Sequence, residues 1–185
     1  MTSPATLKDS SRYMSLLDRL MGRSRPDPKA GMIPLYQAII HRGRAVHWYV
    51  EGAVPDTLDG RFDMIAAILS LVLLRLERAD MRHESVWLTE LFVDDMDGQL
   101  RQIGIGDLVV GKHVGRMMSA LGGRLSAYKD GLAPGGDLDG ALRRNLYRGE
   151  PVDSAATADV AARLRAFAAS LDETAPDVLL RGELP

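Results

Sequence analysis

Residues 58–78, LDGRFDMIAAILSLVLLRLER, decide the fold that this sequence predicts. Apolar side chains recur there at the spacing of an α-helix, and further apolar residues widen the stripe until the segment is apolar almost all round. The main stripe consists of Leu58, Phe62, Ile65, Leu69, Val72 and Leu76. A helix of this kind is buried, so we expect the rest of the chain to pack around it.

Helical periodicity also predicts the elements that surround this central helix. We expect helices at residues 7–21, 34–44, 83–103, 108–128, 138–147 and 157–171, and a short turn or helix at 45–50. Either Asp56 or Thr57 should cap the central helix, because both can accept a hydrogen bond from a free N–H group of its first turn. No segment has a convincing strand pattern. The predicted fold class is all-α, a single irregular bundle of about seven helices around the buried helix 58–78.

Proline, glycine and charged residues divide the chain into a core and two flanking parts. Residues 1–30 are interpreted as an N-terminal helix followed by a Pro/Gly linker. Residues 31–150 are interpreted as the helical core. Residues 151–185 are interpreted as a C-terminal helix with a loosely ordered tail.

The composition limits the functions that the chain can have. The 185 residues are 46% hydrophobic and 26% charged, which is typical of a soluble globular protein. A net charge of −2 argues against bulk electrostatic binding to nucleic acid or to an anionic membrane, although it allows a local basic patch. The absence of cysteine excludes disulfides, thiolate chemistry and cysteine-ligated metal centres. The longest apolar run, residues 64–74, is shorter than the roughly 20 residues of a membrane-spanning helix.

The expected helix 108–128 carries three separate stripes. The apolar stripe consists of Val110, Val114, Met117, Leu121, Leu125 and Tyr128. The small-residue stripe consists of Gly111, Gly115, Ser119, Gly122 and Gly123, and the basic stripe of Lys112, Arg116 and Arg124. Each glycine costs about 1 kcal/mol inside a helix. We therefore interpret the small-residue stripe as a place where another backbone, most simply helix 58–78, packs unusually close.

Several strings resemble catalytic motifs without their required context. Residues 106–112 match GxxxxGK, but His113 stands where a Ser or Thr must bind magnesium, and a helix rather than a strand is expected before it. The acidic run 94–98, DDMDG, fits neither an EF-hand loop nor the DDxxD motif of prenyl-transferring enzymes. The histidines never occur at the i,i+3 or i,i+4 spacing of a helical metal pair. We predict no catalytic residue, no metal site and no cofactor.

Charged residues on the surface remain as candidates for partner binding. The candidates are Arg61, Asp94, Asp95, Arg101, Lys112, Arg116 and Arg124. The alternative is a solvated face with internal salt bridges. Arg61 stands at the positive end of its helix dipole, which predicts a carboxylate partner for it. Asp97 and Arg101 are an i,i+4 pair of the order that supports a helix.

Several segments together resemble the ubiquinol–cytochrome c chaperone family, whose members are assembly factors of the cytochrome bc1 complex. The segments are PDTLDGRFDM (55–64), FVDDMD (92–97), LRQIG (100–104), GDLVVGK (106–112) and the pair Arg116-Met117. They occur in the same order and spacing, within a similarity that runs from about Leu35 to Tyr147. The absence of a long, Arg-rich N-terminal extension favours a bacterial-type member.

This resemblance implies a non-catalytic role. The expected partner is a protein client, cytochrome b or an early bc1 assembly intermediate, together with a small helical co-chaperone. The expected location is cytoplasmic, with transient peripheral contact at the inner membrane, and no nucleic-acid partner is expected. Two other functions stay open, a generic helical adaptor with an unrelated partner and, less favoured, a metal- or nucleotide-dependent enzyme.

Overall fold

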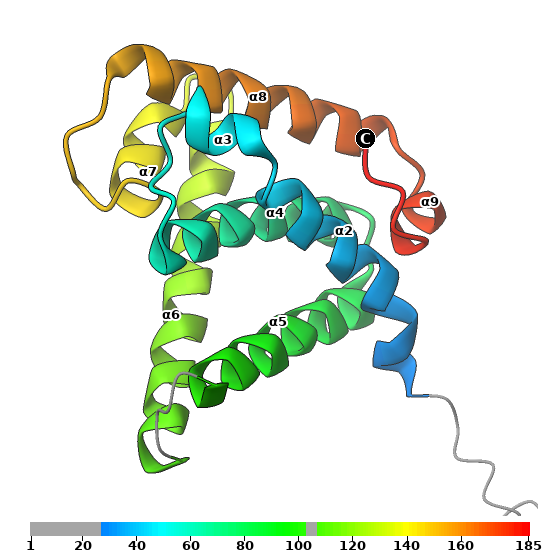
Figure 1. The fold of residues 1–185 in the computed structure, drawn as a ribbon. Helices are drawn as coiled ribbons and strands as arrows, with labels where there is room; N and C mark the ends of the chain where they lie inside the picture. The colour runs from blue at the N-terminus through cyan, green and yellow to red at the C-terminus, as the bar shows by residue number, and fades with distance from the viewer. Residues whose placement is uncertain (1–26, 103–106) are drawn as a thin grey trace, which may run out of the picture.

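The computed structural model describes residues 27–102 and 107–185 (Figure 1). The helix expected at 7–21 lies outside these residues, as does residue 103, the last of the helix expected at 83–103. The elements in order are η1 (Pro28–Met32), α2 (Ile33–Gly43), α3 (Val46–Val50), α4 (Leu58–Arg78), α5 (Arg82–Gln102), α6 (Asp107–Leu132), α7 (Leu138–Asn145), α8 (Ser154–Glu173) and α9 (Pro176–Leu180). The all-α fold class is confirmed, because every regular element in the described residues is helical.

Helix α4 is the centre of the bundle, as its sequence predicts. It spans the expected residues, and Thr57 rather than Asp56 caps it, with the Gly60 N–H donating to Thr57 Oγ1 at 3.1 Å. Every residue from Asp63 to Leu74 is buried. Helices α2, α5, α6 and α8 all pack against it. The first turn differs from the prediction. Leu58, which was expected in the buried apolar stripe, is 61% exposed.

Two glycines allow the segments that precede α4 to pack closely against its N-terminal half. Gly43 ends α2 directly against α4, where an added Cβ would lie 2.9 Å from Ile65 Cγ1 and 3.0 Å from Ile65 Cα. In the first turn of α4, a Cβ at Gly60 would collide with the carbonyl oxygen of Pro55. Both glycines let the chain fold back tightly onto the N-terminal half of the central helix.

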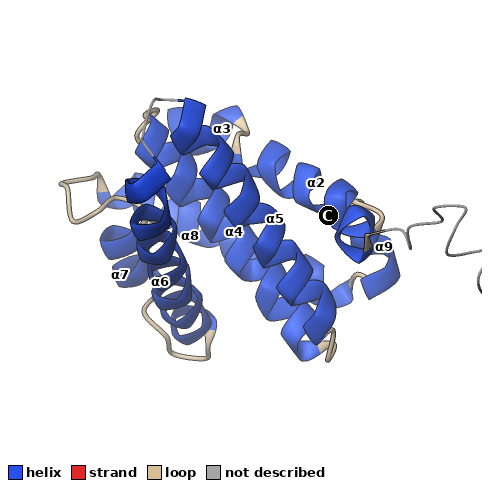
Figure 2. Cartoon of the chain, turned by 90° about the horizontal axis from the view of Figure 1, so that it is seen from below, coloured by secondary structure: helices blue, strands red, loops and turns tan. Residues whose placement is uncertain are grey.

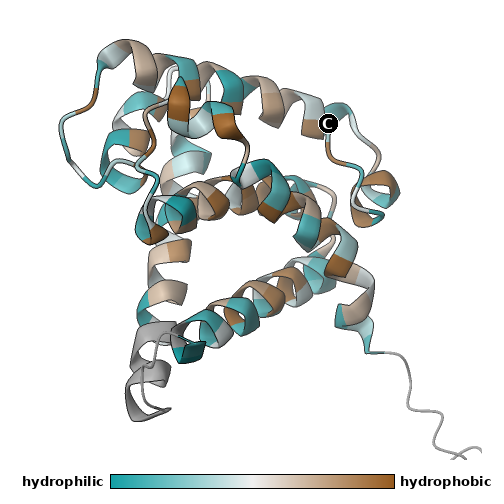
Figure 3. Ribbon diagram, in the orientation of Figure 1, coloured by the Kyte–Doolittle hydropathy of each residue, from teal (hydrophilic) through white to brown (hydrophobic). Residues whose placement is uncertain are grey.

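Helices α5 and α6 extend from the central helix on the same side of the molecule, as Figures 1 and 2 show. Helix α5 presents Leu88, Phe92 and Met96 to the core. Hydrophilic and hydrophobic residues alternate along its ribbon in Figure 3, as in an amphipathic helix. Its acidic residues hold the N-terminal elements, because Lys29 Nζ lies 2.9 Å from Asp94 Oδ2 and the Tyr36 hydroxyl donates to Asp95 at 2.7 Å.

Residues 172–185, expected to be a loose tail, are instead part of the packed structure. Helix α8 continues to Glu173, and α9 follows with Leu179 fully buried. Arg75 of α4 donates to the carbonyl oxygens of Leu171 and Thr174 at 2.7 and 3.0 Å. The end of α8 is therefore fixed to the central helix by partly buried side-chain to backbone hydrogen bonds.

The small-residue stripe of α6 does not pack against the central helix, and our interpretation of it was wrong. Gly115, Ser119, Gly122 and Gly123 are exposed, and a Cβ added at any of the three glycines would meet nothing within 4 Å. Helix α6 contacts the core through the opposite side, with Leu121 and Tyr128 buried. The periodicity identified the residues that share a face, but this face points to solvent.

This arrangement predicts opposite effects of the same substitution at two glycines. Gly122→Ala should stabilise the protein by about 1 kcal/mol, because alanine favours the helix and its methyl group meets no neighbour. Gly43→Ala should destabilise it by about 1–3 kcal/mol, because the methyl group overlaps Ile65. Chemical denaturation of both variants measures the difference, and equal effects would contradict the packing described here.

Candidate functional site

An open cleft lies between the N-terminal end of α4, the C-terminal half of α5 and α6. It has a volume of about 540 Å³. Its walls consist of apolar side chains, glutamines and arginines: Leu58, Asp59, Phe62, Met96, Gln99, Gln102, Arg116, Met117, Ala120, Arg124 and Arg148. A cleft with an apolar floor and a few convergent charged groups is the usual form of a binding site.

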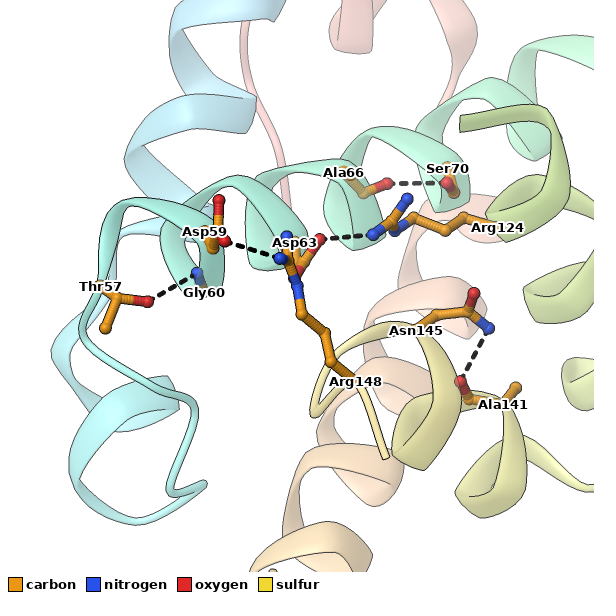
Figure 4. Close-up of polar contacts among 10 residues, drawn as sticks. All are labelled: Thr57, Asp59, Gly60, Asp63, Ala66, Ser70, Arg124, Ala141, Asn145 and Arg148. Carbon is orange, nitrogen blue, oxygen red and sulfur yellow. Dashed lines mark hydrogen bonds and ion pairs between the residues drawn. The ribbon is translucent and has the colours of Figure 1, made fainter. Parts of the chain in front are cut away.

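A buried carboxylate, Asp63 of α4, binds two arginines that come from different segments of the chain. Arg124 of α6 donates from Nη2 to Asp63 Oδ1, and Arg148, which follows α7, donates from Nε to Asp63 Oδ2, both at 2.5 Å. Arg148 also reaches Asp59 Oδ2 at 2.6 Å through Nη1. Figure 4 shows the two arginines approaching Asp63 from different elements. The network therefore connects α4 to α6 and to the chain after α7.

Burial determines the electrostatics of this network. The Asp63 side chain is fully buried, and burial raises the pKa of its carboxyl group above the usual value. The hydrogen bond from Arg148 and the positive charge of Arg124 act in the opposite direction. These two guanidinium groups make a carboxylate tolerable at this depth, because an isolated buried charge costs several kcal/mol.

Arg124 is the most buried cation of the cleft. Its side chain is 11% exposed, and its guanidinium carbon lies 5.5 Å from the centroid of the Phe62 ring. Its Nε is buried and has no hydrogen-bond partner in the described residues. Arg124 therefore keeps unused hydrogen-bonding capacity at the wall of the cleft.

The candidate partner-binding residues do not form one surface. Arg116 and Arg124 line the cleft together, two turns apart on α6. Lys112 lies in α6, but its side chain is outside the described part of the structure. Arg101 pairs with Asp97 at 2.7 Å, as the i,i+4 spacing predicts.

The other candidates lie apart from the cleft. Arg61 has the predicted carboxylate partner, Asp56, at 2.6 Å, and both line a different, shallow depression with Val46 and Val50 of α3. Asp94 and Asp95 are engaged by Lys29 and Tyr36, as described above.

Sequence reasoning missed three members of the site, Asp63, Arg148 and Leu58. Asp63 directly precedes the apolar run 64–74 and follows Asp59 and Arg61, so its sequence context resembles that of an exposed residue at a helix start. Its partners lie 61 and 85 residues away along the chain, so the sequence alone could not identify them. Leu58 was assigned to the core stripe, although the cleft leaves it exposed.

The structure also shows the conformation of the segments that resemble catalytic motifs. Residues 107–112 are helical, so the GxxxxGK string has no loop that could surround a phosphate. Within residues 27–102 and 107–185, no group of His, Asp or Glu side chains is arranged to hold a metal ion. No helix in these same ranges is long and apolar enough to cross a membrane.

The described residues thus form an all-helical bundle with an open, apolar and arginine-lined cleft. Comparison with known families adds the class of protein. The sequence model of the ubiquinol–cytochrome c chaperone family matches residues 51–184, a range that includes α4 to α9. The chain belongs to the ubiquinol–cytochrome c chaperone family.

A solved structure supports the same assignment. The chain is similar to the crystal structure of the Cbp3 homolog from Brucella abortus, with 25% sequence identity and a TM-score of 0.74. The similarity covers 93% of this chain and 94% of that one. A search of curated proteins finds no significant match.

Removing the buried carboxylate should destabilise the bundle. In Asp63→Asn, Arg124 loses its carboxylate partner and Arg148 keeps only Asp59. We expect a loss near the lower end of the roughly 3–5 kcal/mol that breaking a buried pair costs. The lower end applies because Arg148 is 45% exposed and can turn to water. Urea denaturation measures the loss.

Asp59→Asn is the matched control. It changes the same functional group one turn away, where the side chain is 70% exposed, and should cost less than about 1 kcal/mol. Equal losses in the two variants would show that Asp63 does not hold the helices together.

Proposed function

We propose that this protein is a non-catalytic assembly chaperone of the respiratory cytochrome bc1 complex, which binds cytochrome b or an early assembly intermediate. The observation that carries the proposal is the family match over residues 51–184. The similarity to a Cbp3 homolog over nearly the whole of both chains supports it independently. The protein would meet its client from the cytoplasmic side, through peripheral contact at the membrane and with a small helical co-chaperone.

The cleft supports a role in binding. Its floor is apolar, its rim is cationic, and Leu58 and Arg116 are exposed there without a structural task in the described residues. We place the partner surface on α6, around Lys112, Arg116 and Arg124. Arg61, Asp94, Asp95 and Arg101 belong to this proposal only as outlying contacts, because they lie outside the cleft.

Deleting the gene in the source organism tests the role directly. We expect a lower content of spectroscopically detected haem b in the bc1 complex and lower ubiquinol–cytochrome c reductase activity, both restored by the wild-type gene. Succinate dehydrogenase activity serves as the control and should not change. Normal cytochrome b spectra in the deletion strain would contradict the proposal and favour a generic adaptor.

The surface on α6 can be tested separately. The double variant Lys112→Glu, Arg116→Glu should recover less cytochrome b from detergent-solubilised membranes, because it reverses the charge that faces the partner. Its helicity and melting temperature should stay close to those of the wild type. A large loss of melting temperature would instead show that these cations are internal salt-bridge partners.

A further inference from the structure

The cleft holds one cationic group more than its carboxylates neutralise. Arg124 and Arg148 share Asp63, and Arg148 also pairs with Asp59. Arg116 is exposed and has no ion-pair partner among the described residues. The described residues of the cleft therefore leave one positive charge uncompensated, at the wall that α6 contributes.

Arg124, the next arginine on the same face of α6, has a hydrogen-bond donor without a partner among the described residues. Arg116, Ala120 and Arg124 occur at intervals of four residues and line the cleft together. Arg124 uses Nη2 for Asp63, whereas its buried Nε has no partner. A carboxylate that enters the cleft beside this row compensates the charge of the exposed Arg116.

Apolar side chains lie directly beside this row. Leu58 is 61% exposed, and Phe62 and Met117 are partly buried, so the floor offers apolar surface that water now covers. An occupant that combines apolar side chains with one acidic group complements both features at once.

We propose that this cleft binds a helical segment of a partner protein in which one Asp or Glu is flanked by apolar side chains one helical turn away. The carboxylate meets Arg116, and the apolar side chains cover Leu58, Phe62 and Met117. This inference rests on the proposed function only in taking the occupant to be a protein.

The charge count favours a protein segment over a membrane surface. Each basic residue contributes about 1 kcal/mol to binding an anionic bilayer, so stable attachment needs several uncompensated cations. The described residues of the cleft offer one uncompensated cation, because Arg124 and Arg148 form ion pairs with aspartates. A single carboxylate matches this charge.

The shape of α6 favours a helical occupant. Next to the arginine row, the outer side of α6 exposes Gly115, Ser119 and Gly123, and the two glycines have open space where a side chain would be. The rim of the cleft is therefore low on this side, and a second helix can approach α6 without meeting bulky side chains. Arg116 and Arg124 are about 12 Å apart along the helix axis, the length of two turns.

The test uses peptides, so that it does not depend on the identity of the client. A phage-displayed library of random peptides of about 16 residues, or roughly 24 Å of helix, is selected on the full chain. Binding of the selected peptides is then measured by fluorescence anisotropy. We expect them to carry an acidic residue with apolar residues three or four positions away. Arg116→Glu should weaken binding by about 10- to 100-fold, the worth of a lost charge-assisted contact.

Matched variants control for nonspecific effects. Arg144→Glu makes the same charge change at an exposed site on α7, and should leave affinity unchanged. Leu58→Ser should weaken binding, whereas Val86→Ser, at a position 54% exposed on α5 but outside the cleft, should not. Replacing the acidic residue of a peptide by Lys should restore binding to Arg116→Glu.

Three outcomes would overturn the inference. The first is a selected set without acidic residues, and the second is equal affinity for Arg116→Glu and Arg144→Glu. The third is sedimentation with vesicles of equimolar phosphatidylglycerol and phosphatidylcholine that Arg116→Glu abolishes, which would assign the cleft to lipid. None of these bears on the gene-deletion result, so a failure here and a failure of the proposed function remain distinguishable.

Discussion

The burial of α4 on all sides is the constraint on which the structure depends. Every residue of this helix from Asp63 to Leu74 is buried, so the surrounding segments must supply both the apolar contacts and any polar partner that it needs. Its buried carboxylate, Asp63, requires cationic partners at two particular positions. A charge at that depth is stable only when Arg124 and Arg148 reach it, and this fixes how α6 and the end of α7 approach α4.

The cleft follows from the same constraint. Because Asp63 lies in the second turn of α4, the arginines that reach it converge near the helix N-terminus, next to the exposed Leu58. Helices α5 and α6 diverge from α4 there, and a hollow with an apolar floor remains between them. Arg124 stabilises the fold through Asp63, whereas Arg116, two turns earlier on α6, has no such task in the described residues. Structural and binding roles are thus divided between neighbouring cations of one stripe.

Local sequence patterns predicted the helices well, but they did not show which distant segments pack together. The limits of α4 were correct because its apolar run and its Thr57 cap are both local signals. The small-residue stripe of α6 was assigned to the wrong side, because periodicity groups residues by face without showing which face is buried. The residues after 171 were underestimated, since Leu179 becomes a core residue only through packing against distant segments. In the site, Arg116 and Arg124 were identified from a basic stripe of the sequence. Asp63 and Arg148 could be assigned to the site only from their contact in the folded structure.

The exposed glycines of α6 have a consequence for its dynamics. A glycine that packs against nothing still lowers helix stability, and Gly115, Gly122 and Gly123 of α6 have open space where a side chain would be. Among the described side chains of α6, from residue 115 onward, Leu121, Arg124 and Tyr128 are buried, whereas none of residues 115–120 is. Within this described part of α6, local opening should therefore be easiest at residues 115–120, which include Arg116. One wall of the cleft is consequently its least stable part, and a partner helix that orders this wall must offset the entropic cost of doing so.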